Sequence, residues 1–132
     1  MPMKQQILYY QQKLDFEIDA ADLFDALNGT EKIVVLDCRT VEAYEQEHIP
    51  NAINFPHKTI TAKSTAHLDK ALLYVTYCDG IGCNASTKGA LNLASLNFNV
   101  KELSGGLDWW KRDGYKTSGT KAVQGFNTSC GC

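Results

Sequence analysis

The chain has 132 residues, of which 44% are hydrophobic and 21% are charged, and its formal net charge is −2. This length is typical of one globular domain, and the acidic balance argues against nucleic-acid binding because it offers no excess of cations to phosphates. The longest apolar runs are about four residues, far below the roughly 20 that a membrane span needs. The N-terminus has no apolar signal-peptide core, so we expect a soluble, cytoplasmic protein without a membrane span.

The N-terminal part of the chain predicts two helices with a short strand between them. Residues 4–14 partly fit helical spacing and indicate a short amphipathic helix, and residues 16–18 alternate as a short edge strand does. Asp19 is a good N-cap for the helix that follows. We expect that helix to end at Asn28 and Gly29, since both residues tolerate left-handed backbone angles.

The rest of the chain alternates between strands and helices. The β-branched run at 33–36 and the strong run at 72–77 are typical of strands buried on both faces, as in a parallel sheet. The other expected elements are a helix at 41–46, a strand limited by prolines to 52–54, one helical turn within 57–70, a helix at 86–96, a strand at 100–103 and a helix at 107–112. From Thr117 onward the Gly/Ser/Thr-rich sequence predicts a mobile tail.

This alternation predicts an α/β fold with a parallel sheet. In such folds the ligand crevice lies at the carboxyl ends of the strands. We expect an N-terminal helical extension at 1–15, one domain at 16–116 and a flexible tail at 117–132. The sequence leaves the oligomeric state open.

The chemistry of the chain depends on its cysteines, which are Cys38, Cys78, Cys83, Cys130 and Cys132. An odd number without a secretory signal argues against a disulfide framework. Cytosolic cysteines are mostly small buried hydrophobic residues or reactive thiols. Cys38 directly follows a buried strand, so we expect it to be a core residue.

Cys78 stands at the end of the strongest predicted strand and is followed by a glycine-bearing turn and a helix. Such a loop can turn successive backbone N–H groups inward, and the helix adds the positive end of its dipole. Both favour a nucleophilic thiolate, whereas Asp79 opposes it unless its side chain points to solvent. The candidate anion-binding loop comprises Asp79, Gly80, Ile81, Gly82, Cys83, Asn84, Ala85 and Ser86. The alternative is a plain turn with an inert buried cysteine.

Three ordered motifs within residues 16–116 resemble those of the rhodanese domain. The first is an Asp37-Cys38-Arg39 strand end followed by Glu42-Ala43-Tyr44 and by His48-Ile49-Pro50-Asn51-Ala52. The second is Tyr77-Cys78, which matches the strand end with the catalytic cysteine, and the third is the closing segment Gly105-Gly106-Leu107 with Trp110, Gly114 and Tyr115. The resemblance implies a small three-layer α/β domain whose mainly parallel sheet of about five strands is flanked by helices.

The resemblance also implies a sulfurtransferase. Cys78 would attack the outer sulfur of a donor such as thiosulfate, become a persulfide, and pass the sulfur to a thiophilic acceptor. The amides of residues 79–86 would hold the persulfide and the departing anion. The expected partners are a small anionic sulfur donor or a protein persulfide, together with a thiol acceptor, and we expect no cofactor and no metal ion.

The active loop departs from the six-residue loop of many family members. It is longer by about two residues, contains a second cysteine, and has no Arg or Lys between Cys78 and Thr87. Backbone amides are therefore the main expected anion holders, and a low-molecular-weight or protein persulfide fits as a donor as well as thiosulfate does. Cys83 either resolves an oxidised or persulfidated Cys78 by forming a disulfide, or packs beneath the loop.

Other residues of these motifs are expected to support the site. Asp37 and Arg39 are interpreted as holding loops through hydrogen bonds and an ion pair, His48 as a structural hydrogen-bonding group, and Trp110 as a core anchor. The terminal Cys130-Gly131-Cys132 is interpreted as a sulfur relay to Cys78, a soft-metal ligand pair, or an exposed unstructured end.

Three other functions compete with sulfur transfer. Phosphatases and arsenate reductases with a Cys-X5-Arg loop need an arginine six residues after the cysteine, but Asn84 and Gly89 occupy that position after Cys78 and Cys83. A thiol redox sensor or oxidoreductase using Cys78 and Cys83 is the main alternative, followed by a non-catalytic binding module.

Overall fold

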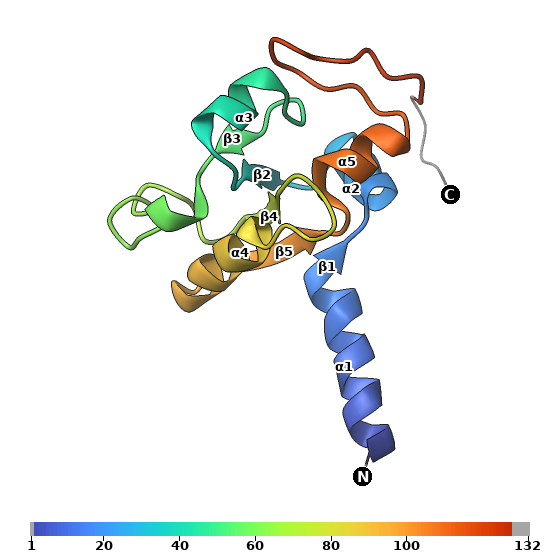
Figure 1. Ribbon diagram of the computed structural model, residues 1–132. Helices are drawn as coiled ribbons and strands as arrows, with labels where there is room; N and C mark the ends of the chain where they lie inside the picture. Colours follow the sequence, from blue (N-terminus) through green and yellow to red (C-terminus); the bar gives the residue numbers. More distant parts are fainter. Residues whose placement is uncertain (1, 128–132) are drawn as a thin grey trace.

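The computed structural model describes residues 2–127. Its centre is a five-stranded sheet of order β1-β5-β4-β2-β3 in which every neighbouring pair is parallel (Figure 1). The strands are β1 (Glu17–Ile18), β2 (Ile33–Asp37), β3 (Ile53–Asn54), β4 (Leu73–Tyr77) and β5 (Asn99–Leu103). The predicted α/β class with a parallel sheet is therefore confirmed.

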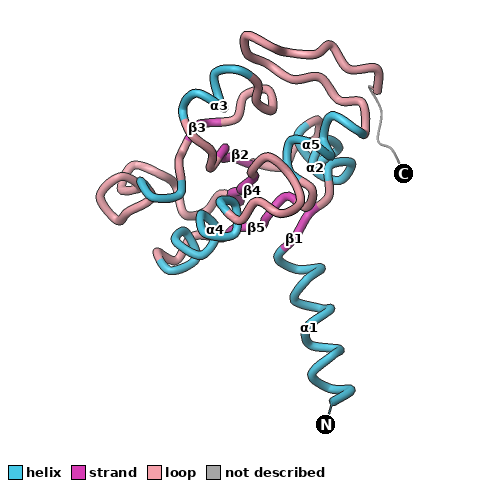
Figure 2. Tube along the Cα trace, viewed as in Figure 1, coloured by secondary structure: helices cyan, strands magenta, loops and turns pink. Residues whose placement is uncertain are grey.

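Helices cover both faces of this sheet and connect its strands (Figure 2). They are α1 (Pro2–Phe16), α2 (Ala20–Leu27), α3 (Val41–Gln46), the 3₁₀ turn η1 (His57–Thr59), α4 (Ala85–Ser95) and α5 (Gly106–Arg112). Leu23 of α2 and Trp110 of α5 share one core, whereas Leu93 of α4 and Ile60, which follows η1, share the other. The architecture is thus three-layered.

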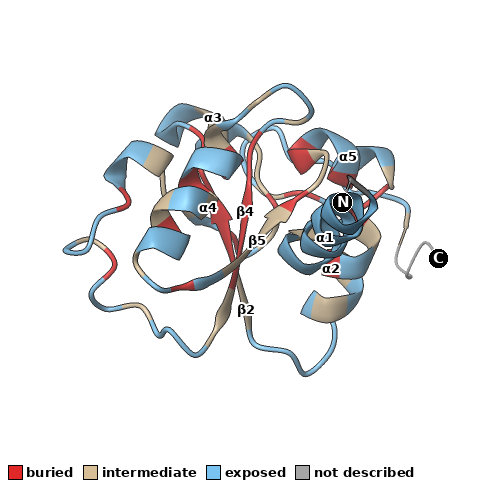
Figure 3. Ribbon diagram, turned by 90° about the horizontal axis from the view of Figure 1, so that it is seen from below, coloured by how far each residue is buried: buried red, intermediate tan, exposed pale blue. Residues whose placement is uncertain are grey.

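The two central strands are buried on both faces, as their apolar runs predicted (Figure 3). Val35 and Val75 belong to the core under α2 and α5, whereas Leu36 and Tyr74 belong to the core under α4. This division follows from the two-residue period of a strand, which sends successive side chains to opposite faces. The register pairs β2 with β4 residue by residue up to Asp37 and Tyr77, so both strands end at the same edge.

The ends of α2 show where a local prediction held and where it failed. The carboxylate of Asp19 accepts a hydrogen bond from the Asp22 amide at 2.8 Å, which confirms the predicted N-cap. The predicted left-handed ending is wrong, because Asn28 has a φ of −91°. Its side-chain amide instead donates to the Phe24 carbonyl at 2.8 Å and satisfies a group that the helix leaves open.

The segment after residue 116, expected to be a mobile tail, lies against the domain over residues 117–127. The amide of Ser118 donates to the His48 carbonyl at 2.8 Å, and the His48 amide donates back at 2.9 Å. Thr117 is buried, and its hydroxyl donates to the Glu47 carboxylate at 2.7 Å. Composition cannot anticipate such pairing, because a Gly/Ser/Thr-rich segment forms backbone hydrogen bonds as readily as any other. Cys130 and Cys132 lie outside the described residues.

Helix α1 begins two residues before the predicted start and ends two residues after the predicted end. It projects away from the sheet (Figure 1), and the side chains of residues 3–16 are all exposed. Within residues 2–127, no helix combines the length and the apolar character needed to cross a membrane.

Candidate functional site

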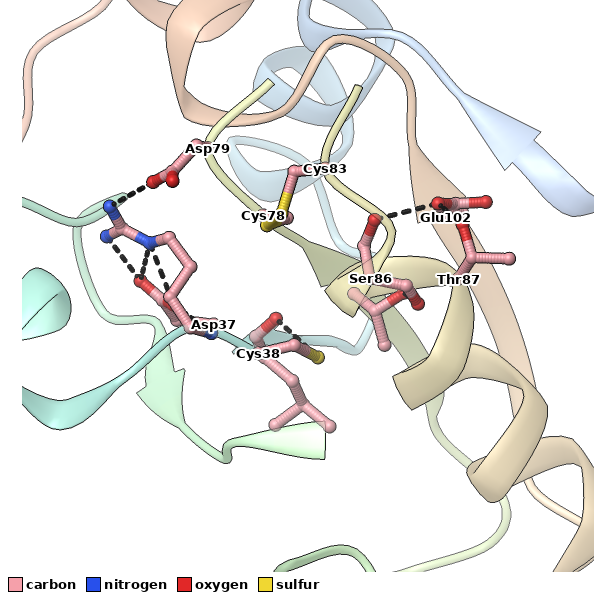
Figure 4. The surroundings of a disulfide bond; sticks show 11 residues. Asp37, Cys38, Cys78, Asp79, Cys83, Ser86, Thr87 and Glu102 are labelled. Atoms are coloured by element: carbon pink, nitrogen blue, oxygen red, sulfur yellow. Dashed lines mark hydrogen bonds and ion pairs between the residues drawn. A yellow bond between two sulfur atoms is a disulfide. The ribbon is translucent and has the colours of Figure 1, made fainter. Parts of the chain in front are cut away.

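Cys78 directly follows β4, at the edge where the parallel strands end. Its side chain is 3% exposed and its sulfur is bonded to that of Cys83 (Figure 4). The two Cα atoms are 6.2 Å apart, within the range that a disulfide requires. The structure thus holds the oxidised pair rather than the free thiolate that the sequence predicted, and a resolving role for Cys83 stays a prediction.

Glycines shape the backbone of the active loop and of the segment that clamps it. Gly82 has a φ of 93°, which favours a residue without Cβ. The amide of Leu107 donates to the Cys78 carbonyl at 3.0 Å, and the amide of Asp108 donates to the Asp79 carbonyl at 2.8 Å. A Cβ on Gly106 would collide with that Cys78 carbonyl. The absence of a Cβ at Gly106 therefore lets the first amides of α5 hydrogen-bond to the backbone of the Cys78 loop.

Helix α4 begins directly after the active loop, at Ala85. Its N-cap residue, Asn84, makes no side-chain capping hydrogen bond. The first-turn amides of a helix lack intrahelical acceptors, and among the described residues those of Ala85, Ser86 and Thr87 have no other acceptor. This open helix end adds partial positive charge next to the cysteine pair.

Arg39 ties the active loop to the end of β2. Its guanidinium lies 2.7 Å from a carboxylate oxygen of the fully buried Asp37 and 3.1 Å from a carboxylate oxygen of Asp79. The side chain of Asp79 is 73% exposed, so its charge is directed to Arg39 and solvent. Burial alone would lower the pKa of Arg39, but the hydrogen bonds and charge of Asp37 raise it. The loop-holding role predicted for this ion pair agrees with these contacts.

Tyr77 continues this network beneath the loop. Its hydroxyl donates to the Asp37 carboxylate at 2.6 Å and accepts from the Ile49 amide at 3.1 Å. Burial first, and then the charge of Asp37, raise the pKa of Tyr77. The hydroxyl therefore stays protonated and holds the two strand ends together.

The side chain of Ser86, unlike its amide, has a partner within residues 2–127. Its hydroxyl and that of Thr87 donate to one oxygen of Glu102, at 2.7 and 2.6 Å (Figure 4). Glu102 lies near the end of β5, the strand next to β4. This acidic residue was missed, because sequence spacing does not show which strand neighbours the active loop.

The cysteine pair lines two recesses of about 360 Å³ each. We call the first the His57 recess, because His57, Lys58 and Arg39 line it together with the two sulfurs. The second, the Glu102 recess, is lined by Glu102, Glu17 and Lys13 beside the loop. The cations absent from the loop are thus supplied by other segments. Burial, followed by the charges of Lys88 and Lys58, lowers the pKa of His57.

Three further predicted residues have structural surroundings. Cys38 is 1% exposed, and burial, with the charge of Asp37, raises its pKa to about 12. One ring nitrogen of His48 lies 2.7 Å from the Tyr44 carbonyl, and the two rings stack. Trp110 is buried and donates to the Lys116 carbonyl at 2.9 Å. The burial of Cys38 agrees with the core position expected for it, whereas the supporting roles of His48 and Trp110 stay predictions.

The loop also gathers a potential set of metal ligands. One atom each of Cys78, Asp79 and Cys83 lie within 4.8 Å of one another. The two sulfurs are bonded together and carry no thiolate charge, and Asp79 is paired with Arg39. In this oxidised form the donor set therefore does not fit a metal ion.

Comparison with known proteins gives a family and several structural neighbours. A model of the rhodanese-like domain matches residues 20–113. The BH2092 protein from Bacillus halodurans is 38% identical, with a TM-score of 0.84 over 95% of this chain and 94% of that one. A Lactobacillus plantarum protein is 32% identical, with a TM-score of 0.71 over 83% of this chain and 92% of that one.

A more distant neighbour is a thiosulfate sulfurtransferase from Pseudomonas aeruginosa. It is 24% identical, with a TM-score of 0.70 over 79% of this chain and 20% of that one. At this identity the likeness shows a shared fold. No curated protein matches the chain.

Proposed function

The chain belongs to the rhodanese-like domain family, and from that premise we propose that it transfers sulfane sulfur from a donor to a thiophilic acceptor through a persulfide on Cys78. One observation carries the proposal. Cys78 follows β4, lines two recesses, and lies beside the uncapped start of α4. A sulfur in this position can meet donor and acceptor while main-chain amides stabilise its charged form.

The reaction begins with reduction of the disulfide. A dithiol reductant supplies two electrons and becomes a disulfide, while Cys78 and Cys83 become thiols. The Cys78 thiol then loses its proton to solvent. The open first turn of α4 favours the resulting thiolate, and the pairing of Asp79 with Arg39 weakens the opposing negative charge.

Sulfur transfer follows in two displacements. The Cys78 thiolate attacks the outer sulfur of thiosulfate; a new S–S bond forms, the original one breaks, and sulfite leaves with its electron pair. An acceptor thiolate then attacks the outer sulfur of the persulfide. The acceptor becomes a persulfide and Cys78 leaves as a thiolate, so the enzyme returns to its starting form.

The His57 recess supports an anionic donor. Lys58 and Arg39 bring positive charge to the recess that the cysteine pair lines, and Asp79, which also lines it, offsets one of these two charges. The loop itself contains no Arg or Lys. The Glu102 recess has two carboxylates and one ammonium group, from Lys13. We therefore propose that the donor enters through the His57 recess, since an anion is attracted there and repelled on the opposite side.

Mass spectrometry tests the proposal directly. The reduced chain, incubated with thiosulfate or with a small persulfide, should gain about 32 Da on Cys78 and lose it when a thiol acceptor is added. Cys78→Ser should gain no sulfur within the loop. A chain that gains no mass with either donor, or gains it only on another cysteine, would contradict the proposal.

The disulfide itself favours thiol redox chemistry as a second candidate function. Cys78 and Cys83 are already bonded, so two-electron oxidation and reduction need no further rearrangement of the chain. Cys83→Ser separates the two candidates, because it removes the disulfide but keeps the proposed nucleophile. Sulfur transfer predicts that this variant still gains about 32 Da. A redox protein predicts only the loss of about 2 Da on oxidation of the unmodified chain.

A further inference from the structure

Helix α1 presents two different faces along its length. Tyr9, Lys13 and Phe16 line a groove of about 520 Å³ together with residues of α4 and β5. Lys13 also pairs with Glu17 at 3.0 Å. This side of α1 therefore faces α4 and β5, whose residues line the same groove.

The opposite side carries what we call the α1 stripe, formed by Met3, Ile7, Tyr10 and Leu14. Their spacing of four, three and four residues is that of a coiled-coil seam. The four side chains are 73%, 56%, 60% and 78% exposed. Gln6 and Gln11 flank them in the same shallow depression, so the surface contains no charge. An exposed apolar stripe of this kind is typical of an interaction surface.

We propose that the α1 stripe binds the α1 stripe of a second copy of this chain in an antiparallel helix pair. With the two-fold axis between residues 8 and 9, Met3 of one protomer lies opposite Leu14 of its partner. Ile7 likewise lies opposite Tyr10. The stripe is therefore complementary to itself, as a two-fold interface requires.

The charges beside the stripe favour this orientation. Lys4 and Asp15 lie on the same flank, near opposite ends of the helix. An antiparallel pair brings Lys4 of one protomer toward Asp15 of its partner, twice by symmetry. A parallel pair leaves the Lys4 and Asp15 residues at opposite ends of the two helices, about 16 Å apart along the axis. Antiparallel packing also places the two domains at opposite ends of a helix that is about 22 Å long.

The helix is shared with another protein of the same fold. The Bacillus halodurans structure covers 95% of this chain, so about 7 of the 132 residues lie outside the match. Helix α1 has 15 residues, and the likeness therefore extends into it. A helix kept with the fold, yet exposed around its whole circumference, is consistent with burial in an assembly.

Sedimentation velocity of the reduced full chain over a concentration series tests the pairing. The expected result is a dimer of about 29 kDa, which is twice the 14.6 kDa mass of the chain. Ile7→Glu should leave only the monomer, because it places a carboxylate in the seam. The matched control is Leu8→Glu, an equally exposed position outside the stripe, which should still dimerise. A monomeric parent chain, or an Ile7→Glu variant that still dimerises, would overturn the proposal.

A charge exchange tests the orientation. Lys4→Glu and Asp15→Lys should each raise the dimer dissociation constant roughly fivefold, because each opposes like charges across the pair. The double variant should restore the parental value. If the single variants have no effect, or the double variant is weaker than both, the antiparallel arrangement is wrong.

Discussion

Two cysteines occupy equivalent positions at the ends of adjacent strands but differ in what surrounds them. Cys38 follows β2 and Cys78 follows β4, and the Cys38 amide donates to the Tyr77 carbonyl at 3.0 Å. Both side chains are buried. A strand-end position and burial therefore do not decide whether a thiol is reactive.

The difference lies in the segments that contact each sulfur. The Cys38 sulfur lies 3.8 Å from the Leu36 carbonyl and is so close to Gly89 that a Cβ there would lie 2.6 Å away. Cys78 is followed by a glycine-bearing loop, lies beside the open end of α4 and contacts Cys83. The comparison teaches that the segment after the strand decides whether a buried thiol meets core atoms or meets a second cysteine and the open end of a helix.

The largest expected effect separates the two cysteines by activity. Cys78→Ser should lower sulfur transfer by about a thousandfold or more, because the nucleophile is removed. Cys38→Ala should leave the rate within about twofold and cost about 1 kcal/mol of unfolding free energy. Steady-state kinetics and denaturant unfolding measure the two quantities. Equal loss of activity in both variants would contradict the comparison.

Removal of Arg39 tests whether its ion pair with Asp37 stabilises the ends of β2 and β4. Arg39→Ala leaves the buried Asp37 without its cation, which should destabilise the chain by about 3 kcal/mol in urea unfolding. The matched control is Arg112→Ala, which breaks an exposed ion pair with Asp108 and should cost less than about 1 kcal/mol. Similar costs for both variants would show that the buried pair does not hold the strand ends.

Gly106→Ala tests the clamp on the Cys78 loop alone. The new Cβ meets the Cys78 carbonyl at a position whose φ is 57°, so we expect the free energy of unfolding to fall by about 2 kcal/mol. The rate of sulfur transfer should also fall under conditions in which the variant is still folded. Gly29→Ala is the control, since its Cβ meets nothing closer than 3.5 Å. Full activity in Gly106→Ala would mean that the clamp does not position Cys78.

The last prediction concerns alkylation of the reduced chain, whose sequence stays unchanged. Because the pKa of Cys38 is raised to about 12, only about one molecule in ten thousand carries its thiolate at pH 8. Iodoacetamide should therefore modify Cys78 and Cys83 and leave Cys38 unmodified until the pH approaches that value. Peptide mapping after alkylation across a pH series measures this. Rapid modification of Cys38 at pH 8 would show that its surroundings are not closed.

Sequence alone predicted the sheet and the position of Cys78, because both depend on local patterns. The apolar runs of β2 and β4 and the glycine turn after Cys78 are readable within a few residues. Lys58, Glu102 and Lys13 were missed, since they reach the site from segments that only the strand order brings together. The packing of residues 117–127 was missed for the same reason, because its partner, His48, lies far away in the sequence.

The most direct measurement is a single turnover of the reduced chain with thiosulfate, followed by peptide mapping and sulfite determination. The proposal predicts one persulfide on Cys78 for each sulfite released, no added sulfur on Cys38, and discharge of the persulfide by a thiol acceptor. Sulfite release without a persulfide on Cys78, or added sulfur mainly on Cys38, would contradict the claim that the loop after β4 creates the reactive site.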